Sequence, residues 1–139
     1  MTEKNIKKSV TVFGSKKMLW AGRIVSAIAV LFLLMDGVMK VMQLTPVMES
    51  FEKLGYPTNV ALSLGILQLV CVICYVIPRT SILGAILLTG YLGGAVATHV
   101  RVGDPLFSHV LFPVYLGILV WGGIWFRNER LRSVIPLQK

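Results

Sequence analysis

An acidic and a basic side chain lie four residues apart inside an apolar stretch of the sequence. Asp36 and Lys40 belong to the segment LFLLMDGVMK, residues 31–40. Their spacing puts both on one face of a helix, where they can form an ion pair. Ionisable groups in an apolar span are costly and are functional candidates by default. A pair that only locks helices together explains the same residues, so a binding role and a structural role both stay open.

Four further polar side chains are candidates for the same site: Tyr91, His99, Arg101 and His109. A site for quinone or another small lipophile needs a few hydrogen-bond donors in apolar surroundings, and Lys40, Tyr91 and His99 offer them. We hypothesise a polar pocket that opens toward the outer face of a membrane. In this hypothesis Asp36 orients Lys40, while Arg101 and His109 line the mouth.

Two histidines near a carboxylate raise the question of a metal. His99 and His109, together with Asp104 or Asp36, could hold a metal ion or relay protons. The spacing is a weak signal, and interfacial histidines without a ligand are commoner, so we predict no metal. We also predict no catalytic residue, because the sequence has no nucleotide-binding loop and no Ser/His/Asp ordering. We expect that the chain is not an enzyme by itself.

Cys71 and Cys74 have the spacing of a redox-active pair. A reactive cysteine needs a nearby cation or a helix N-terminus, and the sequence places neither beside them. We interpret them as ordinary residues of an apolar helix. A dithiol that reacts with a lipophilic oxidant is the alternative.

Small residues recur at a spacing of four in Gly90, Gly94 and Thr98. Such a stripe lets another helix approach closely. We predict that it packs within the helix bundle, and contact between copies of the chain is the alternative.

The composition indicates the elements that must hold these residues. Of the 139 residues, 55% are hydrophobic and 14% charged, against about 25% charged in soluble domains. The net charge of +8 is spread around the apolar runs, as in membrane topology signals. We therefore predict a membrane protein that does not bind nucleic acid.

The apolar runs predict an all-α fold, a bundle of four transmembrane helices. About 20 apolar residues cross a bilayer, and four runs approach or exceed that length, at about 19–42, 60–77, 82–100 and 106–126. A poorly ordered arm, 1–17, precedes them and a basic tail, 127–139, follows. Pro113 is expected to kink the fourth span. In the first loop, 47–54 has apolar residues at helical spacing and predicts a short amphipathic helix.

The Lys and Arg residues predict the orientation. Ten lie in the arm, the tail and the turn at Arg79, whereas only Lys53 and Arg101 lie on the opposite side. Cytoplasmic segments carry the excess of positive residues, so both termini are expected in the cytoplasm. The candidate pocket then falls in the outer half of the membrane.

Several motifs in this order make the chain similar to the DoxX-like family of small four-helix bacterial membrane proteins. They are DGVMK (36–40), GYP (55–57), PRT (78–80), GYLGGA (90–95) with His99 and Arg101, and the end from Trp121 to Arg132. The resemblance implies a multi-pass protein of the bacterial inner membrane. It also implies a membrane subunit of quinone-linked sulfur oxidation or a partner in an oxidative-stress complex, and it supplies no catalytic residues.

These observations predict an accessory or membrane subunit of a redox system that binds quinone or another small lipophile. The alternative is a non-catalytic assembly factor or scaffold that binds a partner through the face of Gly90 and Gly94. A homo-oligomer or a membrane redox partner is compatible with either. A transporter of small molecules would need an oligomer, because four helices rarely form an alternating-access path.

Overall fold

The computed structural model describes residues 2–134, with the backbone alone for residues 6–15. Every element in the described range is helical, as the sequence predicts, and none is a strand. The elements are α1 (Glu3–Val41), α2 (Thr45–Lys53), α3 (Val60–Val76), α4 (Ser81–Val102), the π-helical turn η1 (Leu106–Val110), α5 (Phe112–Arg127) and α6 (Glu129–Val134). Residues 135–139, the end of the predicted basic tail, lie outside the described residues.

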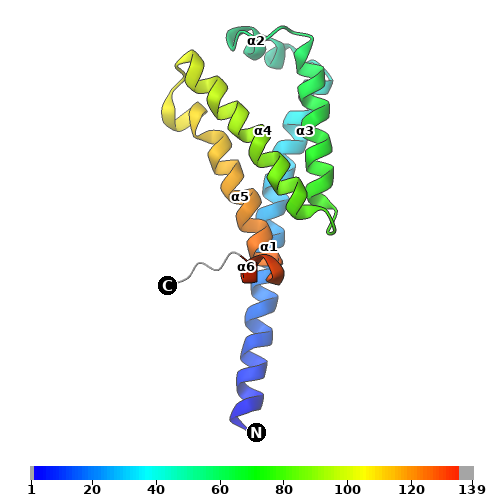
Figure 1. Cartoon of the computed structure of the whole chain (residues 1–139), viewed down its shortest axis with the longest axis vertical. Helices are drawn as coiled ribbons and strands as arrows, with labels where there is room; N and C mark the ends of the chain where they lie inside the picture. Colours follow the sequence, from blue (N-terminus) through cyan, green and yellow to red (C-terminus); the bar gives the residue numbers. More distant parts are fainter. Residues whose placement is uncertain (1, 135–139) are drawn as a thin grey trace.

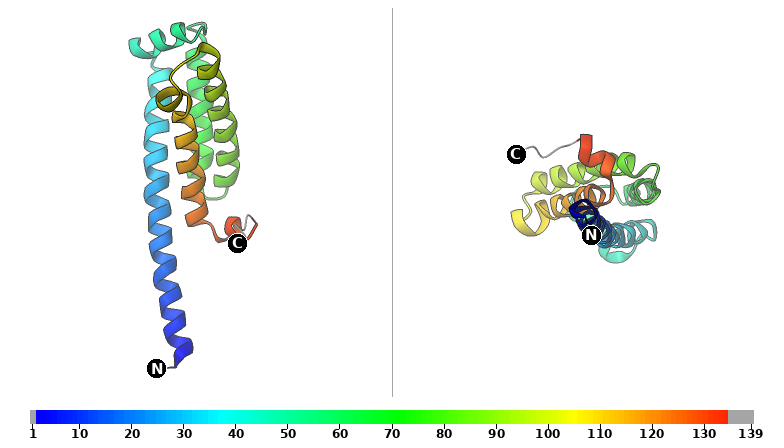
Figure 2. Two further views of the ribbon diagram at one scale, coloured as in Figure 1. Left: turned by 90° about the vertical axis from the view of Figure 1, so that its left-hand side faces the viewer. Right: turned by 90° about the horizontal axis from the view of Figure 1, so that it is seen from below.

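Helix α1 is 39 residues long and begins at Glu3, inside the predicted arm 1–17. Its N-terminal part projects beyond the other helices (Figures 1 and 2). The segment expected to be a poorly ordered arm is therefore a helical extension. The sequence between residues 3 and 19 contains no proline, so no residue there removes a backbone donor or clashes with the preceding turn.

Three segments are long and apolar enough to cross a membrane: Lys16–Val41, Ser81–Val102 and Leu106–Arg127. Helix α3 is equally apolar but has 17 residues. At most a third of an 18-residue stretch in each of these segments is buried inside the isolated chain, and large apolar side chains such as Ile66, Ile73 and Ile86 are exposed. An outer surface of this kind is suited to lipid.

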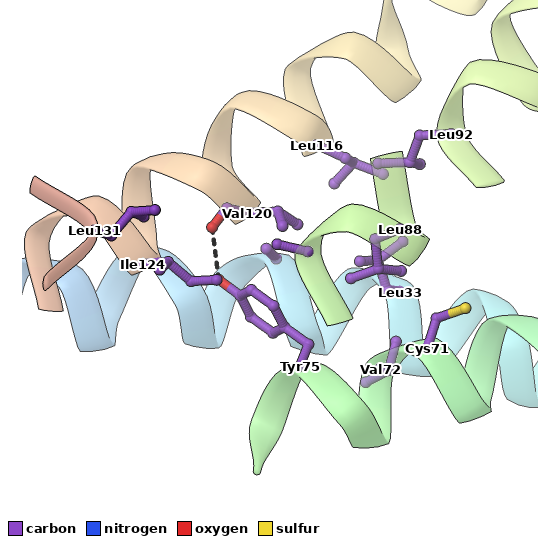
Figure 3. Packing of buried hydrophobic residues seen from close by; sticks show 12 residues of the cluster. Leu33, Cys71, Val72, Tyr75, Leu88, Leu92, Leu116, Val120, Ile124 and Leu131 are labelled. Carbon is purple, nitrogen blue, oxygen red and sulfur yellow. Dashed lines mark hydrogen bonds between the residues drawn. The ribbon is translucent and has the colours of Figure 1, made fainter. Parts of the chain in front are cut away.

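Four long helices pack in a ring, in which α1 and α4 each contact α3 and α5. Their inner faces form one apolar core that includes Leu33, Val72 and Leu88 (Figure 3). Tyr75 crosses this core with 1% of its surface exposed. Its hydroxyl donates to the Val120 carbonyl at 2.8 Å and lies 2.9 Å from the Ser26 hydroxyl, which satisfies the polar end of a buried ring.

Close helix contacts in the ring depend on glycines that the predicted stripe did not include. A Cβ at Gly84 would collide with the backbone of Tyr75, and one at Gly123 would collide with Ser26. At Gly90 and Gly94, by contrast, no described atom lies within 4 Å of the position that a Cβ would occupy. Within the part of the chain that the structure describes, these two glycines do not serve helix packing.

Helix α2 lies across one end of the ring (Figure 1). Val47 and Phe51 are its buried side chains, and they pack with Ala61 and neighbouring apolar groups. This is the amphipathic segment that the sequence predicts, at Thr45–Lys53. Helices α3 and α4 lie close together at the turn that connects them and diverge toward the end where α2 lies (Figure 1).

The connection from α4 to α5 places Pro113 differently from the prediction. Helix α4 ends at Val102 and is followed by Gly103, whose φ of 75° is the left-handed conformation that glycine adopts readily. The π-helical turn follows, and α5 begins at Phe112, so Pro113 stands in its first turn. Proline is tolerated there because the backbone donors of a first helical turn have no partner in the helix. The irregular turn thus lies directly before Pro113, where a proline ring crowds the backbone of the residue four positions earlier.

Candidate functional site

A cavity of about 660 Å³ lies between the ring of helices and α2. Its walls are largely apolar and include Leu64 of α3, Leu92 of α4 and Leu116 of α5. Val47 and Phe51 of α2 cover it. Mostly apolar cavities of 300–1,000 Å³ with a few convergent polar groups are typical of small-molecule sites.

The ammonium group of Lys40 is the centre of the polar groups in this cavity. It donates to Asp36 Oδ2 at 2.6 Å, to Gln68 Oε1 at 2.9 Å and to the Tyr91 hydroxyl at 3.0 Å. These partners come from α1, α3 and α4, so Lys40 joins three helices. Tyr91 lies on the helix diagonally opposite α1 in the ring. We name the four residues the polar floor.

Gln68 is the member of the polar floor that the sequence analysis missed. Its side chain is fully buried, and its Nε2 donates to the Leu33 carbonyl at 2.8 Å. A single amide in the apolar run 60–77 was the available signal. The ion pair of Asp36 and Lys40 drew attention instead, since spacing alone predicts that contact.

The two charges of the polar floor differ in exposure. The Lys40 side chain is 13% exposed, whereas that of Asp36 is 51% exposed. Three hydrogen bonds compensate the desolvation of the ammonium group. Asp36 lines the cavity and neutralises Lys40, so the polar floor carries no net charge.

A second group of polar side chains lines the same cavity, around His99 and His109. His99 Nδ1 lies 2.6 Å from Asp104 Oδ2, and the two imidazole centres are 5.9 Å apart. His109 Nδ1 lies 2.8 Å from the Ser108 hydroxyl. His99 follows Tyr91 by eight residues on α4, a rise of about 12 Å, so this group forms a layer separate from the polar floor. We name His99, Asp104, Ser108 and His109 the histidine rim.

Arg101 has a different position from the one expected at the mouth of the pocket. It is not among the residues that line the cavity. Its guanidinium donates to the Leu54 carbonyl at 2.5 Å and lies 5.7 Å from the centre of the Tyr56 ring. The Tyr56 hydroxyl is 2.8 Å from that of Thr98. Arg101 and Thr98 are both on α4, and their contacts hold the segment just after α2, at Leu54 and Tyr56, against α4.

The remaining candidates lie apart from the polar floor. Gly90 is exposed, whereas Gly94 and Thr98 line the cavity. Cys71 and Cys74 are free thiols. Cys71 packs in the apolar core, and Cys74, three residues later, is partly buried. In the described residues, no group of three or more His, Cys, Asp or Glu side chains could hold a metal ion.

Comparison with known proteins agrees with these observations. The model of the DoxX-like family matches residues 24–123, a range that contains the polar floor and the histidine rim. No curated protein and no solved structure matches the chain. Together with the apolar helices, the family match identifies a multi-pass integral membrane protein. The chain belongs to the DoxX-like family.

Proposed function

We propose that the protein is an accessory or membrane subunit of a redox system and binds quinone or another small lipophile in the cavity. The observation that carries this proposal is the position of Lys40, a nearly buried cation held by three partners on the surface of a largely apolar cavity. An ion pair that served only to lock helices would need no adjacent space. An apolar cavity with a few fixed polar groups fits a lipophile with a polar head.

The proposal includes four membrane spans with both termini in the cytoplasm of a bacterium. Helix α3 rises about 26 Å over its 17 residues, which is near the thickness of the hydrocarbon layer and is at the short end for a span. Its packing between α1 and α4 supports a position at the same depth. The asymmetry of the Lys and Arg residues supports the orientation and places the cavity toward the outer face of the inner membrane.

Family resemblance supports the redox role, since better-known DoxX-like proteins resemble membrane subunits of quinone-linked sulfur oxidation. The apolar walls suit a quinone ring and tail. The Tyr91 hydroxyl and the histidine rim supply polar groups for its oxygens. Arg101 enters this proposal as a positioning residue, because it holds the covering segment and does not line the cavity.

The test is binding of a short-tailed quinone and its quinol to purified protein in lipid nanodiscs, measured by calorimetry. Lys40→Ala and His99→Ala should each lower the affinity at least severalfold. Lys53→Ala is the matched control, since Lys53 is exposed on α2 and has no partner among the described residues. Unchanged affinity in both Lys40→Ala and His99→Ala would remove the cavity as the site.

One observation favours a second candidate, a non-catalytic assembly factor or scaffold. On the small-residue face of Gly90 and Gly94, Gly90 is exposed, does not line the cavity and has no described atom within 4 Å of the position of a Cβ, so another helix could approach it closely there. In this case Gly90→Leu abolishes co-purification of a partner protein, whereas Gly122→Leu, at another open glycine on α5, does not. Retention of the partner by both variants would argue against this role.

A further inference from the structure

The hydrogen bonds of the polar floor determine what it can still offer to a ligand. A lysine ammonium has three N–H donors. Lys40 uses them on Asp36, Gln68 and Tyr91. Lys40 therefore has no donor left for a molecule in the cavity, although it is the cation that suggests a site.

Gln68 is also unavailable to a ligand. Its oxygen accepts from Lys40 and its nitrogen donates to the Leu33 carbonyl. Although Gln68 borders the cavity, the residue is 0% exposed, so a ligand in the cavity does not contact its second amide hydrogen. Its contribution is to hold Lys40 in place.

In the polar floor, two polar atoms remain for a ligand, one acceptor and one donor. Asp36 gives only Oδ2 to Lys40, and within the described part of the chain Oδ1 has no partner. The Tyr91 oxygen accepts from Lys40, so its own hydrogen is free, and no described residue accepts it. Both side chains line the cavity and share Lys40 as a partner, which puts the acceptor and the donor side by side.

This pair of atoms selects against charged head groups. An anionic head would meet the Asp36 carboxylate, and Lys40 could offer it no hydrogen bond. The polar floor has no net charge, so it attracts neither sign of ion strongly in apolar surroundings, where an unpaired charge is costly. A neutral group that both donates and accepts, such as a hydroxyl, matches it.

We propose that the cavity binds an uncharged lipophile through a hydroxyl, as in a phenol or hydroquinone. The ligand O–H donates to Asp36 Oδ1 and its oxygen accepts from the Tyr91 hydroxyl. The inference rests on the proposed function and narrows its ligand class. A quinone in its oxidised form has no donor for Asp36, so the reduced form binds more tightly.

Matched compounds without redox chemistry test this proposal. Purified protein in nanodiscs is titrated with 4-octylphenol, with 4-octylanisole, whose methyl group replaces the donated hydrogen, and with 4-octylbenzoate. The free energy of a hydrogen bond to a charged acceptor is enough to change the binding affinity about tenfold. We therefore expect the phenol to bind about tenfold more tightly than the anisole, and the benzoate to bind most weakly.

Two variants assign the preference to its atoms. Asp36→Asn keeps one oxygen for Lys40 and turns an N–H group toward the ligand, so the preference for phenol should fall to twofold or less. Tyr91→Phe removes the donor that both compounds use, so both should weaken to the same extent and the preference should persist. Unchanged melting temperatures show that either variant is folded.

The outcomes separate the two proposals. Equal binding of phenol and anisole to the wild-type protein overturns the hydroxyl preference and leaves the lipophile cavity standing. Tighter binding of the benzoate overturns the argument from charge. If none of the three compounds binds, both the hydroxyl preference and the proposed cavity are overturned.

Discussion

Replacing Lys40 by methionine removes the centre of the polar floor and keeps a side chain of similar length. The Gln68 oxygen then loses its partner at full burial, which costs about 1–3 kcal/mol. The Asp36 carboxylate also loses its ion pair, which adds to this cost. We expect Lys40→Met to lower the free energy of unfolding by about 2–3 kcal/mol.

A second substitution makes this prediction specific. Gln68→Met in the Lys40→Met background removes the stranded amide. The Leu33 carbonyl, which accepted from that amide, lies inside α1 and keeps its helical partner. The double variant should therefore be more stable than Lys40→Met by the cost of that stranded amide, about 1–3 kcal/mol, and the loss that remains is that of the Asp36 ion pair.

The assay is unfolding in mixed detergent micelles by titration with dodecyl sulfate, followed by tryptophan fluorescence and circular dichroism. Lys53→Met is the control and should change the unfolding free energy by less than about 0.5 kcal/mol, as exposed substitutions do. The reasoning is refuted if Lys40→Met is as stable as the control. It is equally refuted if the effects of Lys40→Met and Gln68→Met simply add, since residues in one network should couple.

Three further predictions concern packing and the covering segment. Gly84→Ala should destabilise the protein by about 1–3 kcal/mol, because its methyl group meets the backbone of Tyr75. Gly90→Ala, at an open helical position, should raise the free energy of unfolding by about 0.5–1 kcal/mol. A detergent titration in which Gly84→Ala is more stable than Gly90→Ala would contradict the packing described for these glycines. Tyr75→Phe should cost about 1–2 kcal/mol in the same titration, since its buried hydroxyl has two partners, and a neutral effect would show that neither bond contributes. Arg101→Gln should free the Leu54 carbonyl and speed backbone hydrogen exchange in Thr45–Lys53 with little change in the core, whereas unchanged exchange would show that Arg101 does not hold this segment.

Apolar run lengths and turn residues were enough to predict the helices. The observed α3 and α4 lie within two residues of the predicted bounds 60–77 and 82–100, because Pro78 and Gly103 mark their ends. The apolar part of α1, Lys16–Val41, agrees with the first predicted span at 19–42. The arm 1–17 was expected to be poorly ordered and is helical from Glu3, since hydropathy reports where a helix can enter a bilayer and not where its hydrogen bonding begins. The number of spans and their orientation stay predictions.

The contacts within the candidate site were predictable only where the chain itself sets them. The spacing of Asp36 and Lys40 predicts their hydrogen bond, and the tight α4–α5 connection brings His99 and His109 together. Gln68 joins the polar floor through the packing of α3 against α1, which no local pattern encodes. Arg101 was assigned to the mouth of the cavity only from its predicted depth in the membrane. The direction of its side chain depends on the path of the connection between α2 and α3, which contains Leu54. A ligand-binding role for these residues stays a prediction.

The small-residue stripe shows why spacing alone misleads in an apolar helix. Gly90 and Gly94 have the spacing of a packing face, yet the close approaches are at Gly84 and Gly123. In a helix exposed to lipid on one side, glycines can lie on either face. Which face meets a neighbour depends on the arrangement of the whole ring.

The most direct test of a ligand cavity beneath α2 is native mass spectrometry of gently extracted protein. Ala95 lines the cavity, whereas Ala97, two residues further along α4, is exposed and does not line it. We expect the wild-type protein and Ala97→Phe to carry one lipophile per chain, and Ala95→Phe, whose ring takes up part of the cavity, to carry clearly less. A wild-type protein without any bound lipophile, or an Ala95→Phe variant that carries as much as the wild type, would contradict the proposed cavity.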